Sequence, residues 1–458
     1  MNLEDIHKAY FIGIGGIGMS AIARYMNSQQ TEVHGYDKTE TTLTRTLASE
    51  GITIHYEDNI SYIPEGVDLV VYTPAVPEQH QELQYFRKEG YVVKKRAEVL
   101  GIISQSKKTL AVAGTHGKTT TSSIAAHLIR SCGVDAAAFL GGIALNFDSN
   151  YVSGQSDWVV VEADEYDRSF LHLRPDIAIL LSMDADHLDI YGSGEQVVVS
   201  FRAFGNCIKD GGTLIIHQQL LEVYGRPALE ELEQRNIDII SYGLEAGQCR
   251  ASAVQVRNGH FVFDYLSPTE NIPAITFRLP GHHNTENATA AIAAAQQLGL
   301  GGEAIKAGLA SFKGIKRRFE MIYQDKRSVY IDDYAHHPSE LRAAIAAARS
   351  LFPDRKITGV FQPHLYSRTR DFAEGFAQAL DELDELLLLD IYPARELPIP
   401  GISSTSLLDR MNNPSKSLIS KSALLDHLRQ QRPEVLLTLG AGDIGALVEP
   451  IKALLSDE

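Results

Sequence analysis

Short apolar runs alternate with amphipathic, helix-like stretches along almost the whole 458-residue chain. Runs such as YFIGI, TLAVA, WVVVE and IAILLS are each long enough for one buried strand. Strands that alternate with helices in this way are typical of βαβ units, in which helices cover parallel sheets. The pattern therefore predicts an α/β fold.

The alternation is interrupted twice, which divides it into three blocks. A polar stretch at residues 104–108 leads into the strand TLAVA, and a basic, glycine-containing stretch at residues 312–318 precedes a third series of strands and helices. At the usual domain size, a chain of this length holds roughly two to four domains. We predict three, at residues 1–105, 106–315 and 316–458.

The composition argues against several classes of protein. Acidic residues outnumber basic ones by 58 to 42, and the resulting net charge of −16 argues against a general nucleic-acid binder. The three cysteines are too few and too widely spaced for a disulfide framework, and the N-terminal residues lack the features of a signal peptide. No apolar run is long enough to span a bilayer. We expect a cytoplasmic protein that binds neither nucleic acid nor membrane.

The first chemical motif is a glycine turn between a strand and a helix. Gly13, Gly15 and Gly18 form G-x-G-x-x-G, and Asp37 follows at the end of a second strand. Such glycines let the backbone approach a diphosphate, which the N-H groups of the helix N-terminus then bind. NAD, a flavin or a UDP-sugar would each supply a diphosphate, and a turn used only for packing is the alternative.

The second motif, GTHGKTT at residues 114–120, also lies between a strand and a helix. Val112 stands where a strict Walker A motif has its first glycine, so the general pattern is only partly met. The chemistry does not need that glycine. Backbone N-H groups can bind the phosphates, Lys118 can neutralise their charge and the Thr119 hydroxyl can ligate Mg²⁺. A capped turn without a ligand is the alternative.

Two further candidates follow apolar strands of the second block. Glu162 ends WVVVE, and His187 follows IAILLSMDAD, so both are expected at the sheet edge that binds ligands. A carboxylate suits Mg²⁺, whereas imidazole is an unusual ligand for it, and chemistry alone leaves ligation by His187 open. The acidic residues Asp164, Glu165 and Asp167 fit a solvated loop and are assigned no separate role.

The third block contains basic and polar residues near strand ends. Arg318 belongs to a basic pair at the start of the block, and His364, Tyr366 and Arg368 follow the strand KITGVFQ. Cations and a hydroxyl at this edge suit a carboxylate or a phosphoryl oxygen. A polar loop that only contacts solvent is the alternative.

Taken in order, the motifs resemble the Mur ligase family. The resemblance rests on GIGGIGMSAIA, AGTHGKTTT, VEADEYDRSF, SMDADHLDIYG, GHHNTENATAAIAAA, KRRFE, DDYAHHP and FQPHLYSRT, between residues 13 and 369. It implies an N-terminal Rossmann-like domain for a UDP-sugar and a central ATPase domain with a P-loop and a parallel sheet. It also implies a C-terminal Rossmann-like domain that closes over ATP and the amino acid.

The activity implied by the resemblance is an ATP- and Mg²⁺-dependent amide ligation in peptidoglycan precursor synthesis. L-alanine would be joined to the lactyl carboxylate of UDP-N-acetylmuramate through an acyl phosphate. The partners would be these small molecules, and the protein a monomer or a homodimer. A ligase that adds a whole tripeptide to the same sugar nucleotide shares several motifs and remains an alternative. An NAD-dependent oxidoreductase and a non-catalytic nucleotide-binding regulator explain fewer of them.

The resemblance also implies roles for individual residues. UDP-sugar binding is implied for Gly13, Gly15, Gly16, Ile17, Gly18, Asp37 and Thr73. ATP binding is implied for Gly114, Thr115, His116, Gly117, Lys118, Thr119, Thr120, Asn284, Asn287, Arg318 and Asp333. Metal binding is implied for Thr119, Glu162 and His187, and amino-acid binding for Tyr334, His336 and Arg368. The catalytic residues would be Lys118, Glu162, His187, His364 and Arg368.

Overall fold

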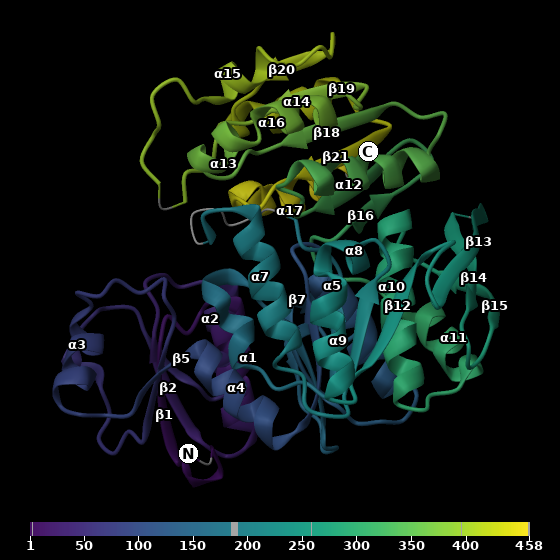
Figure 1. The fold of residues 1–458 in the computed structure, drawn as a ribbon. Coiled ribbons are helices and arrows are strands. Elements are labelled where there is room, and N and C mark those ends of the chain that lie inside the picture. Colours follow the sequence, from purple (N-terminus) through teal and green to yellow (C-terminus); the bar gives the residue numbers. More distant parts are fainter. Residues whose placement is uncertain (2, 185–190, 258, 395, 457–458) are drawn as a thin grey trace. The chain divides into compact units, whose positions relative to one another are not determined.

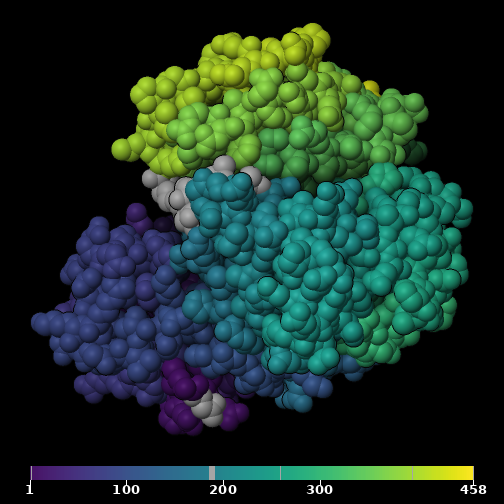
Figure 2. All heavy atoms as spheres, in the orientation of Figure 1, coloured from purple at the N-terminus to yellow at the C-terminus, as the bar shows by residue number. Residues whose placement is uncertain are grey.

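The computed structural model describes residues 1, 3–184, 191–257, 259–394 and 396–456 (Figure 1). Its contacts divide the chain into two compact units. The first comprises residues 1–252, 264–275 and 286–312, and the second comprises residues 253–263, 276–285 and 313–458. In the space-filling view, residues 313–458 form one continuous green-to-yellow body (Figure 2).

The first unit opens with a parallel sheet whose five described strands have the order β3-β2-β1-β4-β5. Because β1 is central, the turn that follows it lies between the ends of β2 and β4. The strands are β1 (Lys8–Ile12), β2 (Glu32–Tyr36), β3 (Thr53–His55), β4 (Leu69–Tyr72) and β5 (Val93–Lys95). The helices are α1 (Ile17–Ser28), α2 (Thr42–Ser49), α3 (Gln81–Lys88) and α4 (Arg96–Ser106), with η1 (Leu3–Asp5) and η2 (Ile60–Tyr62) as 3₁₀ turns.

A second sheet, with ten strands in the described part of the chain, has the order β15-β14-β13-β12-β11-β10-β6-β9-β7-β8. Strands β13, β12, β11, β10, β6, β9 and β7 form a run of parallel pairs, and β8 pairs antiparallel with β7. The strands are β6 (Lys108–Ala113), β7 (Ala137–Ala144), β8 (Ser149–Val152), β9 (Trp158–Ala163), β10 (Ile177–Leu180), β11 (Thr213–His217), β12 (Asp238–Leu244), β13 (Cys249–Arg257), β14 (His260–Leu266) and β15 (Ile272–Phe277).

Helices cover this second sheet. Strand β6 is fully buried from Leu110 to Ala113, because it lies inside the sheet and is packed on both faces, which explains its continuous apolar run. The helical elements are α5 (Lys118–Ser131), η3 (Tyr166–His172), α7 (Gly194–Gly205), α8 (Leu220–Tyr224), α9 (Arg226–Gln234), α10 (His282–Gln297) and α11 (Gly302–Ser311).

The second unit holds a sheet whose six described strands have the order β16-β17-β21-β18-β19-β20. Only the pairing of β16 with β17 is antiparallel among these described pairs. The strands are β16 (Glu320–Gln324), β17 (Val329–Asp333), β18 (Ile357–Phe361), β19 (Glu385–Leu388), β20 (Lys416–Leu418) and β21 (Val435–Leu439). The helical elements are α12 (Pro338–Leu351), α13 (Tyr366–Asp371), α14 (Ala373–Leu380), α15 (Ser404–Leu408), α16 (Lys421–Gln430), η4 (Asp443–Leu447) and α17 (Val448–Ser456).

Three sheets rich in parallel pairs confirm the predicted α/β class. The proposed limits at residues 105 and 315 stay predictions, since the contacts group the first sheet and most of the second into one unit and assign residues 253–263 to the other.

Candidate functional site

The glycine turn after β1 is held by the end of β2. The backbone N-H groups of Gly13 and Ile14 both donate to the Tyr36 carbonyl, at 2.8 and 3.0 Å. The Gly15 N-H donates to Asp37 Oδ2 at 2.7 Å. A Cβ atom on Gly15 would lie 2.8 Å from that same oxygen, so this close approach requires glycine. The structure thus brings Asp37 to the turn, as the fingerprint predicted.

The other predicted UDP-sugar residues surround the same turn. A Cβ on Gly13 would lie 2.9 Å from the Thr73 methyl group, which places the end of β4 beside the turn. Gly16 and Ile17 are exposed, and no side chain caps the N-terminus of α1. This combination leaves an open helix N-terminus, which is the geometry that binds a diphosphate.

The segment 114–117 turns sharply between β6 and α5. Gly114 and Gly117 have φ values of +143° and +80°, which favour glycine. The Thr115 hydroxyl donates to the Asp184 carbonyl at 3.1 Å, and the His116 N-H donates to Ser182 Oγ at 2.9 Å. The turn is thereby attached to the segment that follows β10. Thr119 and Thr120, in the first turn of α5, are both 6% exposed.

The Lys118 ammonium lies inside this turn. It donates to the Gly114 carbonyl at 2.7 Å and to the Thr115 carbonyl at 3.2 Å. It also contacts both carboxylate oxygens of Glu165, at 2.9 and 2.7 Å. Burial alone would lower the pKa of Lys118, but the nearby carboxylates of Glu165, Asp164 and Glu162 together outweigh it and raise that pKa above its ordinary value. The lysine therefore stays charged.

Glu165 corrects the interpretation of the acidic stretch after β9 as a solvated loop. Its side chain is only 3% exposed. Its neighbours are also engaged, because Asp164 accepts a bond from Arg96 at 3.2 Å and Asp167 one from Lys95 at 3.0 Å. Both basic residues lie at the start of α4 and its flank, so the stretch connects the first sheet with the P-loop. The contacting residues are far apart in the sequence, so this arrangement could not be predicted from it.

Glu162 lies at the end of β9, next to the P-loop strand. Its backbone pairs with Val112 of β6, and its Oε2 accepts the Gly141 N-H at 2.9 Å. A Cβ on Gly141 would lie 2.2 Å from Glu162 Oε1, so the carboxylate packs directly on that backbone. Carboxylate and hydroxyl oxygens from Glu162 and Thr119 suit Mg²⁺. The third predicted ligand, His187, lies outside the described residues.

Both predicted asparagines lie on α10. A Cβ on Gly117 would lie 2.7 Å from Asn287 Oδ1, so Asn287 is beside the P-loop. Asn284 donates from Nδ2 to the Pro280 carbonyl at 2.6 Å and is 3% exposed. The two residues therefore differ in their surroundings, and the structure brings Asn287 to the P-loop glycine.

In the second unit, Asp333 and Arg318 lie together. The guanidinium of Arg318 lies 5.0 Å from the centre of the Tyr334 ring. Asp333 accepts the N-H groups of Phe319 and Ala335, both at 2.7 Å. Burial raises the pKa of Asp333 to about 6, against the lowering effect of Arg318 and the two backbone bonds. The Asp333 carboxyl group therefore gains or loses its proton at a pH of about 6.

Two of the predicted amino-acid residues, Tyr334 and His336, form an aromatic row with the predicted catalytic residue His364 at the ends of β17 and β18. The Tyr334 and His336 rings are 5.3 Å apart, and the His336 and His364 rings are 6.2 Å apart. His364 also stacks on Tyr392, with ring centres 5.7 Å apart. Burial lowers the pKa of His336, with an opposing effect of Glu340 and a further lowering by Arg368. Tyr392 was not predicted, since no motif surrounds it.

None of the helices in the described ranges is long and apolar enough to cross a bilayer.

Three family models match successive parts of the chain. The Mur ligase family catalytic domain matches residues 8–108, the Mur ligase middle domain matches 112–295, and the Mur ligase glutamate ligase domain matches 317–442. Together with a full-length relative at 50% identity, these matches show that the chain belongs to the Mur ligase family. It is an ATP-dependent ligase with the three-domain architecture of that family, as the motifs predicted.

Two full-length relatives carry the same name. The UDP-N-acetylmuramate--L-alanine ligase of Flavobacterium psychrophilum is 50% identical over 462 residues, which cover 100% of both chains. The enzyme of that name from Porphyromonas gingivalis is 49% identical over 457 residues, which cover 98% of this chain and 99% of the relative.

Two solved structures share the fold of this chain. The UDP-N-acetylmuramate-alanine ligase of Thermotoga maritima has a TM-score of 0.82 at 27% identity, with coverage of 98% of this chain and 100% of that chain. A murein peptide ligase from Psychrobacter arcticus has a TM-score of 0.70 at 23% identity, with 99% coverage of both chains, and shows a shared fold.

Proposed function

We propose that this protein joins L-alanine to the lactyl carboxylate of UDP-N-acetylmuramate with the consumption of ATP. The observation that carries the proposal is the charged Lys118 inside the P-loop, close to Glu162 at a neighbouring strand end. The names of the full-length relatives support the choice of substrates.

The chemistry starts from a carboxylate, which is a poor acylating agent. The carboxylate oxygen attacks the γ-phosphorus of ATP, the bond to the β-phosphate bridging oxygen breaks, and ADP leaves. The product is an acyl phosphate. The neutral amine of L-alanine then attacks the acyl carbon, a tetrahedral intermediate forms and loses inorganic phosphate, and the amine proton is released. Positioning and charge stabilisation supply most of such catalysis.

The roles of individual residues follow the resemblance, and the geometry of the described residues supports several of them. Lys118 would stabilise the charge on the transferred phosphoryl group, while the open turn beside Asp37 would hold the UDP diphosphate. Glu162 and Thr119, with His187, would hold Mg²⁺, which when bound neutralises phosphate charge. His364 and Arg368 are assigned to the reacting carboxylate, and the remaining assignments keep the roles given by the resemblance. The amino acid would contact Tyr334 and His336, and the nucleotide would contact Arg318 and Asp333.

The test is phosphate release from ATP and Mg²⁺ by the purified protein with UDP-N-acetylmuramate. Three parallel reactions contain L-alanine, the wall tripeptide or no acceptor. Release that needs L-alanine supports the proposal, and release only with the tripeptide moves the assignment to a recycling ligase. No release with any acceptor contradicts the proposal.

The matched variants are Lys118→Ala and Lys88→Ala, the second an exposed lysine of α3. We expect Lys118→Ala to lose turnover by about a hundredfold or more, as removal of one charge-stabilising donor does elsewhere. Lys88→Ala should retain the wild-type rate.

A further inference from the structure

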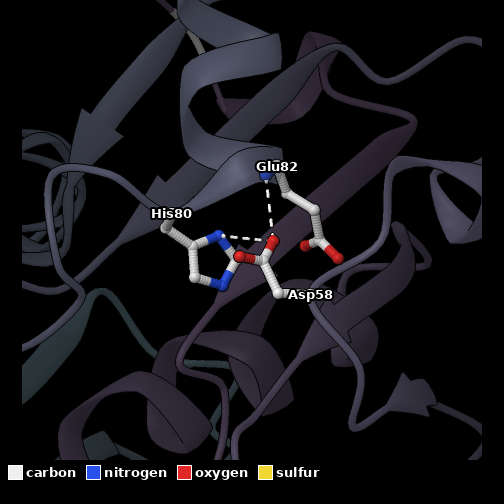
Figure 3. A group of neighbouring side chains, drawn as sticks. All are labelled: Asp58, His80 and Glu82. Atoms are coloured by element: carbon white, nitrogen blue, oxygen red, sulfur yellow. Dashed lines mark hydrogen bonds and ion pairs between the residues drawn. The ribbon is translucent and has the colours of Figure 1, made fainter.

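A separate group of ionisable side chains lies in the domain of the first sheet and shares no residue with the site above. Asp58, His80 and Glu82 offer one oxygen or nitrogen atom each, and these three atoms all lie within 4.8 Å of one another (Figure 3). Asp58 follows β3, while His80 and Glu82 lie at the start of α3. The fold therefore joins two segments that are distant in sequence.

Backbone bonds hold Asp58 in place. Its Oδ2 accepts the Gln81 N-H at 2.9 Å and its Oδ1 accepts the Glu82 N-H at 3.2 Å. The carboxylate thus caps the first turn of α3 from outside the helix, and Figure 3 shows it between the other two side chains. Each oxygen retains a second lone pair for another ligand.

His80 is buried against this carboxylate. It is 6% exposed, and its Nδ1 lies 3.2 Å from Asp58 Oδ1. Neither ring nitrogen has a hydrogen bond of good geometry with any described residue. The ring packs edge-on against Tyr36, with centres 4.6 Å apart. Burial of an imidazole whose nitrogens lack hydrogen bonds costs folding free energy. A ligand bound to one of these nitrogens would offset that cost.

Glu82 is held by a second set of bonds. It is fully buried, its Oε2 accepts the Tyr10 hydroxyl at 2.8 Å, and its Oε1 accepts the Asn59 N-H at 3.1 Å. The His55 Nε2 lies 3.4 Å from Glu82 Oε1 and 2.6 Å from the Tyr10 oxygen. Such outer contacts orient a carboxylate in the way that supporting residues orient metal ligands.

The charges in this group do not balance. In the described part of the chain, the ion-pair partners of the two carboxylates are the histidines His55 and His80, with no lysine or arginine. Carboxylates whose basic neighbours are imidazoles have no permanently cationic partner, and a bound cation would supply one.

We propose that Asp58, His80 and Glu82 bind one divalent transition-metal cation of the Zn²⁺ type. One imidazole nitrogen and two carboxylate oxygens are ordinary Zn²⁺ ligands, and water would complete a tetrahedron. At metal–ligand distances of about 2.0–2.1 Å, tetrahedral ligands lie about 3.3 Å apart. The 3.2 Å between His80 Nδ1 and Asp58 Oδ1 agrees with that spacing. The Asp58 side chain is 27% exposed, which leaves a route for the ion.

Binding would connect the loop after β3 to the first turn of α3. The cation would stabilise the folded protein by an amount that grows with the logarithm of its concentration relative to its Kd. The role is structural and independent of the ligase chemistry, so its test does not depend on turnover.

The experiment uses the full-length protein, treated with EDTA and then freed of it, without nucleotide. Zn²⁺ binding is measured by calorimetry, and Co²⁺ binding by its visible absorption, which reports imidazole and carboxylate ligation. The test variants are His80→Asn and Glu82→Gln. Asparagine is a good residue to precede a helix, so His80→Asn is expected to fold. Glu89→Gln, an exposed acid at the end of α3, is the matched control.

We expect one equivalent to bind to the wild type and to Glu89→Gln, and at least a tenfold weaker affinity in His80→Asn. Glu162→Gln identifies ions at the candidate Mg²⁺ site and should leave this equivalent in place. No Zn²⁺ binding by the wild type at about ten micromolar, unchanged binding in His80→Asn, or loss in Glu162→Gln would each overturn the proposal. If Glu82→Gln fails to fold by circular dichroism, the wild type and His80→Asn still decide the result.

Discussion

The Lys118 ammonium and the Glu165 carboxylate form a buried ion pair, with Nζ 2.7 Å from Oε2. A triphosphate at the P-loop would need the same ammonium group, so Glu165 and the nucleotide compete for it. Because Glu165 is 3% exposed, water screens this competition little. We therefore expect Glu165 to influence the affinity for the nucleotide.

Removal of that competing charge should strengthen nucleotide binding. In Glu165→Gln, Lys118 keeps its bonds to the Gly114 and Thr115 carbonyls but loses its charged partner. We expect ADP to bind about fivefold more tightly, or by about 1 kcal/mol, in calorimetry without UDP-sugar. Asp167→Asn, a nearby acid that pairs with Lys95 instead, should leave ADP affinity unchanged. Weaker ADP binding in Glu165→Gln would show that the carboxylate supports the nucleotide site.

Gly117 and Gly133 offer a matched pair of alanine substitutions around α5. Both have positive φ, at +80° and +95°, so each alanine should cost about 1–2 kcal/mol of unfolding free energy. A Cβ at 117 would also lie 2.7 Å from Asn287 Oδ1, whereas one at 133 would meet nothing within 4 Å. ADP affinity should fall only in Gly117→Ala. Equal ADP affinities in the two variants would contradict the placement of Asn287 at the nucleotide.

Asp333 should make stability depend on pH. Its folded pKa, about 6, exceeds the ordinary value of 3.8, so between these values the folded state binds more protons than the unfolded state. Stability should accordingly be highest at low pH with respect to this group and fall as pH rises from about 4 to 6. A tenfold change in proton affinity is worth about 1.4 kcal/mol, so the loss should amount to a few kcal/mol.

The check is the thermal unfolding midpoint of the wild type and Asp333→Asn at several pH values from 4.5 to 7. The difference between the two proteins should shift in favour of the variant as pH rises. Asp354→Asn, an exposed acid of the same unit, should follow the wild type throughout. A constant difference between wild type and Asp333→Asn would argue against proton uptake by Asp333.

Asp37 should affect the UDP-sugar and leave ATP unaffected. Alanine at position 37 removes the acceptor of the Gly15 N-H, which shapes the glycine turn. We expect the KM for UDP-N-acetylmuramate to rise about tenfold, since a lost hydrogen bond of this kind is worth about 1–2 kcal/mol. Glu40→Ala, at an exposed position three residues later, is the control. A parallel rise in the KM for ATP would indicate a general disturbance of the fold.

Features encoded by adjacent residues could be predicted from the sequence. The glycine turn after β1 and the segment 114–120 each consist of consecutive residues between a strand and a helix, and their positive φ values require glycine locally. The parallel sheets followed from the alternation of strand and helix patterns. Neighbouring parallel strands end at one edge, which is why Glu162 was predicted near the P-loop.

Contacts between distant segments required the tertiary structure. Glu165 looked like a solvated loop residue, but packing buries it against Lys118, 47 positions away. His364 meets Tyr392 across the ends of β18 and β19, and no pattern marks that tyrosine. Asp58 and Glu82 lie 24 positions apart and meet only because Asp58 caps α3. Residue type and order determined the family and its local motifs, whereas burial and pairing of charges depend on the packing of whole elements, because desolvation arises only when they come together.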